Sequence, residues 1–383
     1  MKSVDSFVTK IPSPAFVCEV ELLENNLKLL KRVQDEADIK ILLALKGFAL
    51  KSTFELCRKY LQGCCASGLN EAKLAYEEFR GEVHTYSPAF KPNEFEEISQ
   101  ISNHIVFNSF NELKRYKDNV KPHNSLGLRI NPEYSTVEVD LYNPCGVYSR
   151  LGITKKEFEK HKSDELLSSI EGFHFHALCE QNFDVFEGAF LKFETNFAEY
   201  FKNLKWLNFG GGHHITRSDY DVDGLILFLK KIRKKYPHLT LYMEPGEAVG
   251  WQTGYLEATV LDIVHNDIDI VILDTSAECH MPDTLAMPYK AEVREASSDP
   301  DEKQYRYRLG GNTCLAGDIM GDYSFDKPLK VGQKVIFEDM IHYTMVKTTT
   351  FNGINLPSIV LRYNNDHFEK ITDFDYKNYQ SRI

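Results

Sequence analysis

The sequence predicts an α/β protein that has a closed (β/α)8 barrel followed by a second, all-β domain. From about residue 20 to 250, eight short apolar runs alternate with amphipathic stretches. Eight parallel strands with intervening helices are what a closed barrel requires, and roughly 250 residues is its usual size. Beyond residue 251 the strand pattern continues with little helical periodicity. These observations favour a TIM barrel plus a C-terminal β-sandwich or β-barrel domain.

Each apolar run of the first segment has the pattern of a strand that is buried on both faces. The run at 39–45 (IKILLAL) is continuous, as in parallel sheets. Between the runs, apolar residues recur at helical spacing, as at Leu23, Leu27 and Leu30. An open doubly wound sheet, which usually has fewer strands, is the alternative prediction. The other seven expected strands lie at 63–67, 82–87, 104–108, 125–130, 170–176, 206–210 and 240–245.

The expected domain boundaries follow from this change of pattern. Residues 20–250 are predicted to form the barrel and residues 251–383 the β domain. The opening stretch 1–19 contains a strand-like pattern and is expected to join the β domain. Strands of that domain are expected at 255–264, 269–275, 303–311, 334–339, 342–349 and 358–364.

Composition narrows the class of protein. The 383 residues include 45 Lys and Arg against 56 Asp and Glu, which gives a net charge of −11. An acidic chain without a basic block argues against nucleic-acid binding and is compatible with a cationic small substrate. The eight cysteines are scattered with no CxxC pair, which indicates a reducing compartment. With no signal-peptide pattern and no apolar run of membrane-spanning length, we expect a cytoplasmic protein.

Residues that carry chemistry gather where the predicted strands end. The active site of such a barrel lies at the carboxyl ends of its strands. Six of the eight expected strands end in, or run into, a polar, titratable or glycine-rich segment. These segments are Lys46, Ser67, Arg129, His176, Gly210–Gly212 and Glu244–Glu247.

Lys46 and Glu244 suggest a nucleophile and an acid. Lys46 follows five apolar residues, and burial disfavours its charged form and leaves the neutral amine that forms a Schiff base. A lysine that extends its ammonium group to water is the alternative. Glu244, followed by Pro245, is suited to hold a pyridine nitrogen protonated. An ordinary ion-pairing or helix-capping acid is the alternative there.

The glycine run and the strand-end histidine suggest a phosphate site and a stacking ring. Gly210–Gly212 follow the seventh strand and Gly246 the eighth, the two loops that often build phosphate sites in these barrels. A plain flexible turn is the alternative. His176 can stack on a flat ring, although a structural histidine is the commoner outcome. The pairs His174/His176 and His213/His214 lack a third ligand at zinc spacing, so no metal is predicted.

The joint placement of these groups points to pyridoxal phosphate, and the sequence resembles a known family. The matching segments run from LALKGF through CCASGLNE, LRINP, SRLGI, GFHFHALCE, NFGGGHH and EPGEAV to GNTCLAGD and EDMIHYTMVKTTTFNG. Across nearly the whole chain they resemble the fold-type III pyridoxal-phosphate decarboxylases, an alanine-racemase-like barrel plus β domain. The forms HALCE, NFGGGHH, EPGEAVGW and GNTCLAGD are most similar to carboxynorspermidine/carboxyspermidine decarboxylases within that family.

The resemblance implies a role for each cofactor-binding residue. Lys46 would carry pyridoxal 5'-phosphate as a Schiff base, His176 would stack on its ring, and Glu244 would pair with the pyridine nitrogen. The residues that would hold the phosphate are Gly210, Gly211, Gly212, Gly246 and Tyr343.

The resemblance also implies a homodimer with two composite sites. Cys314 of the β domain would reach into the partner's site as the proton donor. A carboxy-polyamine substrate needs acids for its distant ammonium groups, and the candidates are Asp318, Asp283 and Glu180. The chain departs from the family at Glu247, where relatives often carry an Arg that contributes to the phosphate pocket.

The implied activity is decarboxylation of carboxyspermidine or carboxynorspermidine to spermidine or norspermidine and carbon dioxide, in polyamine biosynthesis. Diaminopimelate decarboxylase, of lysine biosynthesis, is the alternative within the family. A catalytically silent relative that binds a partner protein is disfavoured because Lys46 is present. A racemase is disfavoured because Glu244 stands where racemases of this fold typically place Arg.

Overall fold

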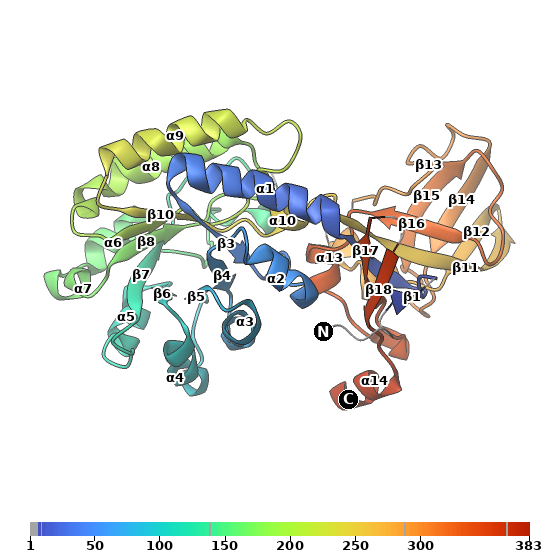
Figure 1. The fold of residues 1–383 in the computed structure, drawn as a ribbon, viewed down its shortest axis with the longest axis horizontal. Coiled ribbons are helices and arrows are strands. Elements are labelled where there is room, and N and C mark those ends of the chain that lie inside the picture. Colours follow the sequence, from blue (N-terminus) through green and yellow to red (C-terminus); the bar gives the residue numbers. More distant parts are fainter. Residues whose placement is uncertain (1–6, 9, 138, 287–288, 365–366) are drawn as a thin grey trace. The chain divides into compact units, whose positions relative to one another are not determined.

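The computed structural model describes residues 7–8, 10–137, 139–286, 289–364 and 367–383 (Figure 1). The chain divides into two compact units. One is Asn25–Val249, and the other combines Met1–Glu24 with Gly250–Ile383. The boundaries predicted from the sequence lie after residue 19 and after residue 250.

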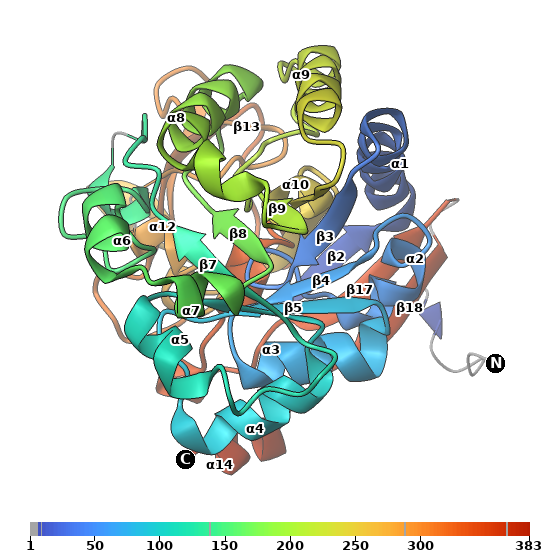
Figure 2. The same cartoon turned by 90° about the vertical axis from the view of Figure 1, so that its left-hand side faces the viewer.

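The unit Asn25–Val249 contains a closed barrel of eight strands, which confirms the predicted fold class (Figure 2). Each strand pairs in parallel with the next along the chain, and β10 pairs with β3 to close the ring. Every expected apolar run forms one of these strands. They are β3 (Lys40–Ala44), β4 (Gly63–Ala66), β5 (Glu82–Tyr86), β6 (His104–Phe107), β7 (Ser125–Ile130), β8 (Gly172–Phe175), β9 (Trp206–Asn208) and β10 (Thr240–Met243).

Helices surround the barrel strands (Figure 2). The inner face of α8 is aromatic, with Phe186, Phe190, Phe193 and Phe197 all buried. Phe173 of β8 packs on it, edge to face with Phe193 at 6.3 Å between ring centroids. The helices are α1 (Val20–Ala37), α2 (Phe54–Cys57), α3 (Leu69–Leu74), α4 (Pro92–Ile101), α5 (Phe110–Tyr116), α6 (Lys155–His161), α7 (Asp164–Ser168), α8 (Phe183–Phe201), α9 (Val222–Lys235) and α10 (Glu247–Gly250).

The amino end of the barrel interior is filled by Trp206, the first residue of β9. Two neighbouring strands make room for its indole with glycines. A Cβ at Gly172 would lie 2.0 Å from Cδ2 of Trp206, and one at Gly127 would lie 2.3 Å from its Cη2. The indole nitrogen donates to Ser125 Oγ at 2.8 Å. In barrels of this kind the active site lies at the opposite end, where the carboxyl ends of the strands meet.

The second unit contains a mixed sheet of ten strands. The opening stretch joins it, because β2 pairs antiparallel with β11 and parallel with β17. Its helices are α11 (Ala277–His280), α12 (Asp283–Ala286), α13 (Tyr343–Val346) and α14 (Tyr376–Arg382). Its strands are β1 (Phe7–Val8), β2 (Ala15–Glu19), β11 (Gly254–Asn266), β12 (Ile268–Leu273), β13 (Ala296–Ser297), β14 (Tyr305–Gly310), β15 (Ile319–Phe325), β16 (Lys334–Glu338), β17 (Ser358–Tyr363) and β18 (His367–Thr372).

The strand predicted at 342–349 is wrong. The segment forms a single helical turn, α13, in which the backbone N–H groups of Met345 and Val346 donate to the His342 carbonyl. Buried Thr344 donates its hydroxyl to Asp283 Oδ2 at 3.1 Å. This tertiary contact outweighs the strand preference of the aromatic and β-branched residues in the segment.

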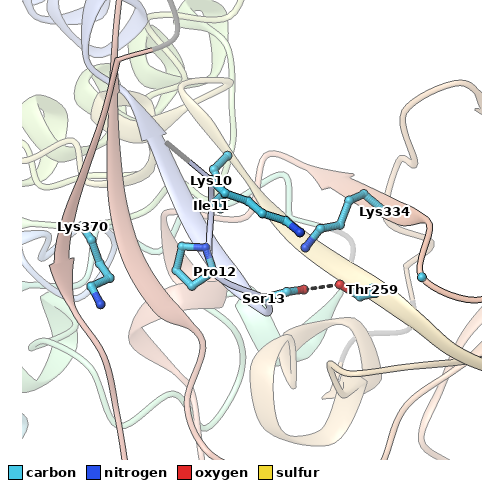
Figure 3. A pocket seen from close by; sticks show the side chains of 8 residues that line it. Lys10, Ile11, Pro12, Ser13, Thr259, Lys334 and Lys370 are labelled. Atoms are coloured by element: carbon cyan, nitrogen blue, oxygen red, sulfur yellow. Dashed lines mark hydrogen bonds between the residues drawn. The ribbon is translucent and has the colours of Figure 1, made fainter. Parts of the chain in front are cut away.

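A cavity of about 410 Å³ lies within the second unit (Figure 3). Lys334 and Lys370 on its wall pair with Glu257 at 3.1 Å and Asp373 at 2.5 Å. The lining residues are Lys10, Ile11, Pro12, Ser13, Thr259, Gly332, Lys334 and Lys370. This list includes no predicted site residue, so the cavity is separate from the candidate site. Among the described residues, no helix has both the length and the apolar character needed to cross a bilayer.

Candidate active site

Close backbone contacts bring the predicted residues to one rim of the barrel. The loop after β3 packs on the loop after β10, since a Cβ on Gly47 would lie 2.9 Å from the Glu247 nitrogen. A Cβ on Gly211 would lie 2.4 Å from the Glu244 carbonyl oxygen and 3.3 Å from Cε1 of His176. The structure therefore gathers Lys46, His176, Gly210–Gly212, Glu244 and Gly246 at the carboxyl end of the strands.

Lys46 lies two residues beyond the end of β3. Its side chain is accessible to solvent. Desolvation by the surrounding barrel and the positive charge of Arg129 nevertheless lower its pKa. The two properties are compatible because a group at a barrel mouth is ringed by protein yet still reached by water. A lowered pKa increases the fraction of neutral amine, which is the form that attacks a carbonyl carbon.

Glu244 is a buried carboxylate with a hydrogen-bond donor on each oxygen. The imidazole Nε2 of His174 lies 3.2 Å from Oε2, and the Asn208 amide donates to Oε1 at 2.6 Å. Burial opposes ionisation, but the electrostatic attraction and hydrogen bond of His174, the nearby His84 imidazole and the Asn208 amide outweigh it and hold the pKa of Glu244 below its ordinary value. The site therefore contains a fixed negative charge beneath its rim.

Two backbone N–H groups of the glycine run have acceptors within the barrel. The backbone N–H of Gly210 donates to Asn208 Oδ1, and that of Gly211 donates to His176 Nδ1, both at 2.9 Å. These two groups already have acceptors, so the run is not an open row of three phosphate donors. Gly210 and Gly212 adopt φ values of 67° and 81°, a backbone region that favours glycine.

His176 has its ring orientation fixed by the bond from Gly211. Because Nδ1 accepts that hydrogen bond, it carries no proton. Desolvation and the nearby positive charge of Lys46 lower the pKa of His176 well below its ordinary value. A neutral imidazole with a fixed orientation is suited to stack on a flat ring.

Arg129, Asn208 and His174 are functional candidates for which the sequence alone predicts no role at the site. The Arg129 guanidinium is 6% exposed and lies 4.6 Å from the ring centroid of Tyr86. Its Nε is buried and has no hydrogen-bond partner among the described residues. Arg129 was recognised as a strand end, whereas Asn208 and His174 lie inside strands, where alternation alone makes them look like core.

Glu247 stands next to Gly246 and belongs to a small acidic group. Its Oε2 lies 3.9 Å from Nε2 of His214, a residue that is 2% exposed. Glu180, Glu247 and His214 each place one polar atom within 4.8 Å of the others. Glu180, a predicted substrate-binding residue, therefore lies on the barrel rim beside Glu247.

The remaining predicted residues belong to the β unit. Cys314 is exposed, and its backbone N–H donates to Asn352 Oδ1 at 2.6 Å. Tyr343 begins α13 and is half-buried. Asp283 Oδ2 accepts hydrogen bonds from Tyr289 at 3.0 Å and Thr344 at 3.1 Å. Asp283 Oδ1 is buried and has no partner among the described residues.

Asp318 does not fit the role predicted for it. It is 3% exposed, and its carboxylate accepts hydrogen bonds from Ser276, Ala277, Glu278 and Thr313 at 2.7–3.2 Å. The two oxygens connect the start of α11 to the loop that carries Thr313 and Cys314. The hypothesis that Asp318 binds a substrate amine is therefore not retained.

Fold and site together define a pyridoxal-dependent enzyme, and comparison with known proteins agrees. The family model "Pyridoxal-dependent decarboxylase, C-terminal sheet domain" matches residues 15–341. A carboxynorspermidine/carboxyspermidine decarboxylase from Campylobacter jejuni is 50% identical and covers 98% of this chain and 100% of its own. A carboxyaminopropylagmatine decarboxylase from Synechocystis is 46% identical and covers 98% of this chain and 96% of its own.

A solved structure gives the same result. Carboxynorspermidine decarboxylase from Campylobacter jejuni, in complex with norspermidine, superposes with a TM-score of 0.90 at 48% identity over 97% of this chain and 100% of that one. The chain belongs to the pyridoxal-dependent decarboxylases, carboxy-lyases whose cofactor is pyridoxal phosphate. Within them it groups with the carboxynorspermidine/carboxyspermidine decarboxylases, which confirms the predicted resemblance.

Replacing Arg129 by methionine is expected to raise the pKa of Lys46. The substitution removes a nearby positive charge that favours the neutral amine. Modification of Lys46 by an amine-reactive reagent in the cofactor-free protein, measured across pH by peptide mass spectrometry, should therefore shift to higher pH. Arg150→Met, at an exposed position, is the matched control and should leave the profile unchanged. An unshifted or lowered profile for Arg129→Met would contradict the account.

Proposed function

We propose that this chain removes the α-carboxylate of a carboxy-polyamine, carboxyspermidine or carboxynorspermidine, in polyamine biosynthesis. The observation that carries the proposal is the shared rim of Lys46, His176 and Glu244 in a chain 50% identical to a relative of that name. The function predicted from the sequence agrees with the names of two relatives, which are 50% and 33% identical.

The residues at the rim fit pyridoxal phosphate. Lys46 offers an amine with a lowered pKa for covalent attachment. Glu244 offers an ionised carboxylate whose hydrogen-bond donors leave each oxygen a further lone pair for a ring N–H. Arg129 holds a buried N–H without a protein acceptor among the described residues, a position suited to an anionic oxygen. When bound, the cofactor supplies an electron-poor ring that accepts the electron pair left by the departing carboxylate.

The chain's own residues divide the remaining tasks. Glu244 would keep a proton on the ring nitrogen, and His176 would hold the ring in plane from one face. Decarboxylation replaces the lost carbon dioxide by one proton at the same carbon, so a proton donor is required. We assign that donor to Cys314, an exposed thiol of the β unit.

The acids proposed to bind the substrate's distant ammonium groups are Glu180 and Asp283. Glu180 lies with Glu247 on the barrel rim, so two carboxylates flank the imidazole of His214. This acidic group suits a polyamine, and it accounts for an acid at 247 in place of a phosphate-binding Arg. Asp283 contributes a buried carboxylate oxygen with no partner among the described residues.

A second candidate substrate is carboxyaminopropylagmatine. The relative named for its decarboxylation is 46% identical over nearly the whole chain. The two kinds of substrate share a carboxyaminopropyl end and differ at the far end, where one carries an ammonium group and the other a guanidinium group. Diaminopimelate decarboxylases are only 16% identical and support the fold alone.

Carbon dioxide release from parallel substrates tests the proposed function. Purified enzyme with pyridoxal phosphate is offered carboxyspermidine, carboxynorspermidine, carboxyaminopropylagmatine and meso-diaminopimelate. We expect release from the first two, and loss of at least about a thousandfold in Lys46→Ala because the covalent attachment point is gone. Lys59→Ala removes an exposed lysine and serves as the control.

Each other outcome redirects the proposal. Release from carboxyaminopropylagmatine alone would move the assignment to the second candidate. Release from meso-diaminopimelate alone would retain the family and contradict the polyamine assignment. No release from any of the four substrates would contradict decarboxylation of this substrate class.

We also propose that the enzyme is a homodimer with composite sites, to which Cys314 of one protomer contributes across the interface. The support is its exposed position beside other exposed apolar side chains, Leu315 at 41% and Phe351 at 44%. Free thiols at all eight cysteines support a reducing compartment, the cytoplasm.

Mixing two inactive variants tests the composite site. Lys46→Ala and Cys314→Ala are each expected to be nearly inactive as homodimers. After subunit exchange in equal amounts, half of the dimers are mixed and each carries one intact site, so about 25% of wild-type activity should return. Either variant refolded with itself is the control. No recovery, in spite of mixed dimers detected by mass spectrometry, would place Lys46 and Cys314 in one protomer's site.

A further inference from the structure

Glu244 is a buried carboxylate that is held by hydrogen-bonding side chains. It is 7% exposed, and its hydrogen-bond partners include His174 at 3.2 Å and Asn208 at 2.6 Å, with the neutral Cys65 thiol as a further partner. Asn208 is a neutral amide. The protonation state of His174 therefore decides whether Glu244 already has a counter-charge in contact or keeps its charge available for a ligand.

The surroundings of His174 indicate a neutral imidazole with its proton on Nε2. Its Nδ1 is buried and has no hydrogen-bond partner among the described residues. A proton there would leave a buried donor unsatisfied, whereas a bare nitrogen lone pair costs less. Desolvation also lowers the pKa of His174. The single proton on Nε2 then points at Glu244 Oε2.

The ring of His174 is held in this orientation by a stack of side chains. Tyr86 lies parallel to it at 5.7 Å between centroids and 27° between planes. The Tyr86 hydroxyl donates to Asn108 Oδ1 at 2.9 Å, and Arg129 lies over the Tyr86 ring at 4.6 Å. Rotation of the imidazole away from Glu244 would have to disturb this stack.

The amide of Asn208 has only one orientation that satisfies both of its neighbours. Its oxygen accepts the backbone N–H of Gly210 at 2.9 Å, so its NH₂ group must face Glu244 Oε1. One side chain thus connects the loop after β9 to the acid after β10. A shift of the glycine run would also change the hydrogen bonding of the carboxylate.

We propose that His174 and Asn208 are positioning residues that keep Glu244 ionised and aimed, so that its charge is available to a protonated ring nitrogen of the cofactor. Because both donors are neutral, the negative charge is not cancelled by a contacting cation. A cationic N–H of the ligand would supply the counter-charge of Glu244. This inference rests on the proposed function, since it concerns the same cofactor site.

The test compares two ligands that differ only at the ring nitrogen. Cofactor-free protein is titrated with pyridoxal phosphate and with its analogue in which carbon replaces that nitrogen, and both Kd values are measured by fluorescence. Wild type should bind pyridoxal phosphate more tightly. His174→Leu should shrink the ratio of the two Kd values by about tenfold or more, the scale of a lost charge-assisted hydrogen bond. Asn208→Ala should shrink it in the same direction.

Two variants separate positioning from packing. His174→Gln retains a donor at about the same reach and should recover most of the ratio. His104→Leu, at another barrel histidine that stacks on His84 at 3.8 Å, should leave the ratio unchanged. A purely structural role would weaken both ligands equally and leave the ratio intact.

The outcomes distinguish this inference from the function on which it rests. If wild type binds pyridoxal phosphate more tightly than the analogue, and His174→Leu and Asn208→Ala keep the same ratio of Kd values, the positioning role alone is overturned. A wild-type ratio near one, or no binding of pyridoxal phosphate, would overturn the proposed cofactor role of Glu244 and this inference with it.

Discussion

Closure of a parallel barrel is the constraint on which this site depends. A barrel of eight strands that all run in one direction must place all eight carboxyl ends on the same rim. Lys46, His176 and Glu244 are distant in the chain, but the barrel topology alone brings them to the same rim. No specific contact between these side chains is needed to bring them there. Trp206, accommodated by Gly127 and Gly172, fills part of the opposite end of the barrel interior.

Electrostatics then assign different roles to groups that share this rim. Desolvation and Arg129 move Lys46 toward its neutral form, which is the reactive one. The His174 and His84 imidazoles and the Asn208 amide hold Glu244 in its charged form. Lys46 and Glu244 follow neighbouring strands of the barrel, β3 and β10. The pKa values of both groups are lowered, which favours the neutral form of the amine and the charged form of the carboxylate. The acid at 247 extends the negative character of the rim, in keeping with a cationic substrate.

The sequence predicted the barrel well because its strands are continuous apolar runs, a pattern that few other structures produce. Lys46, His176 and Glu244 could be singled out as candidates from the sequence because each follows such a run. His174 and Asn208 were not found because they lie within strands, where only the three-dimensional partner reveals a polar function. The helical turn α13 was missed because Asp283, far away in the chain, determines its conformation through Thr344. The sequence also does not reveal that donors within the β unit, such as Ala277 and Thr313, already occupy the carboxylate of Asp318.

The central claim is that Lys46 is the covalent anchor of pyridoxal phosphate. The most direct test is reduction of the purified, cofactor-loaded enzyme with borohydride, followed by peptide mapping for the pyridoxyl group. The account predicts one modified peptide, with the label on Lys46, and a protein that retains the label after denaturation. A label on another lysine, or no retained label at all, would contradict the assignment of the site.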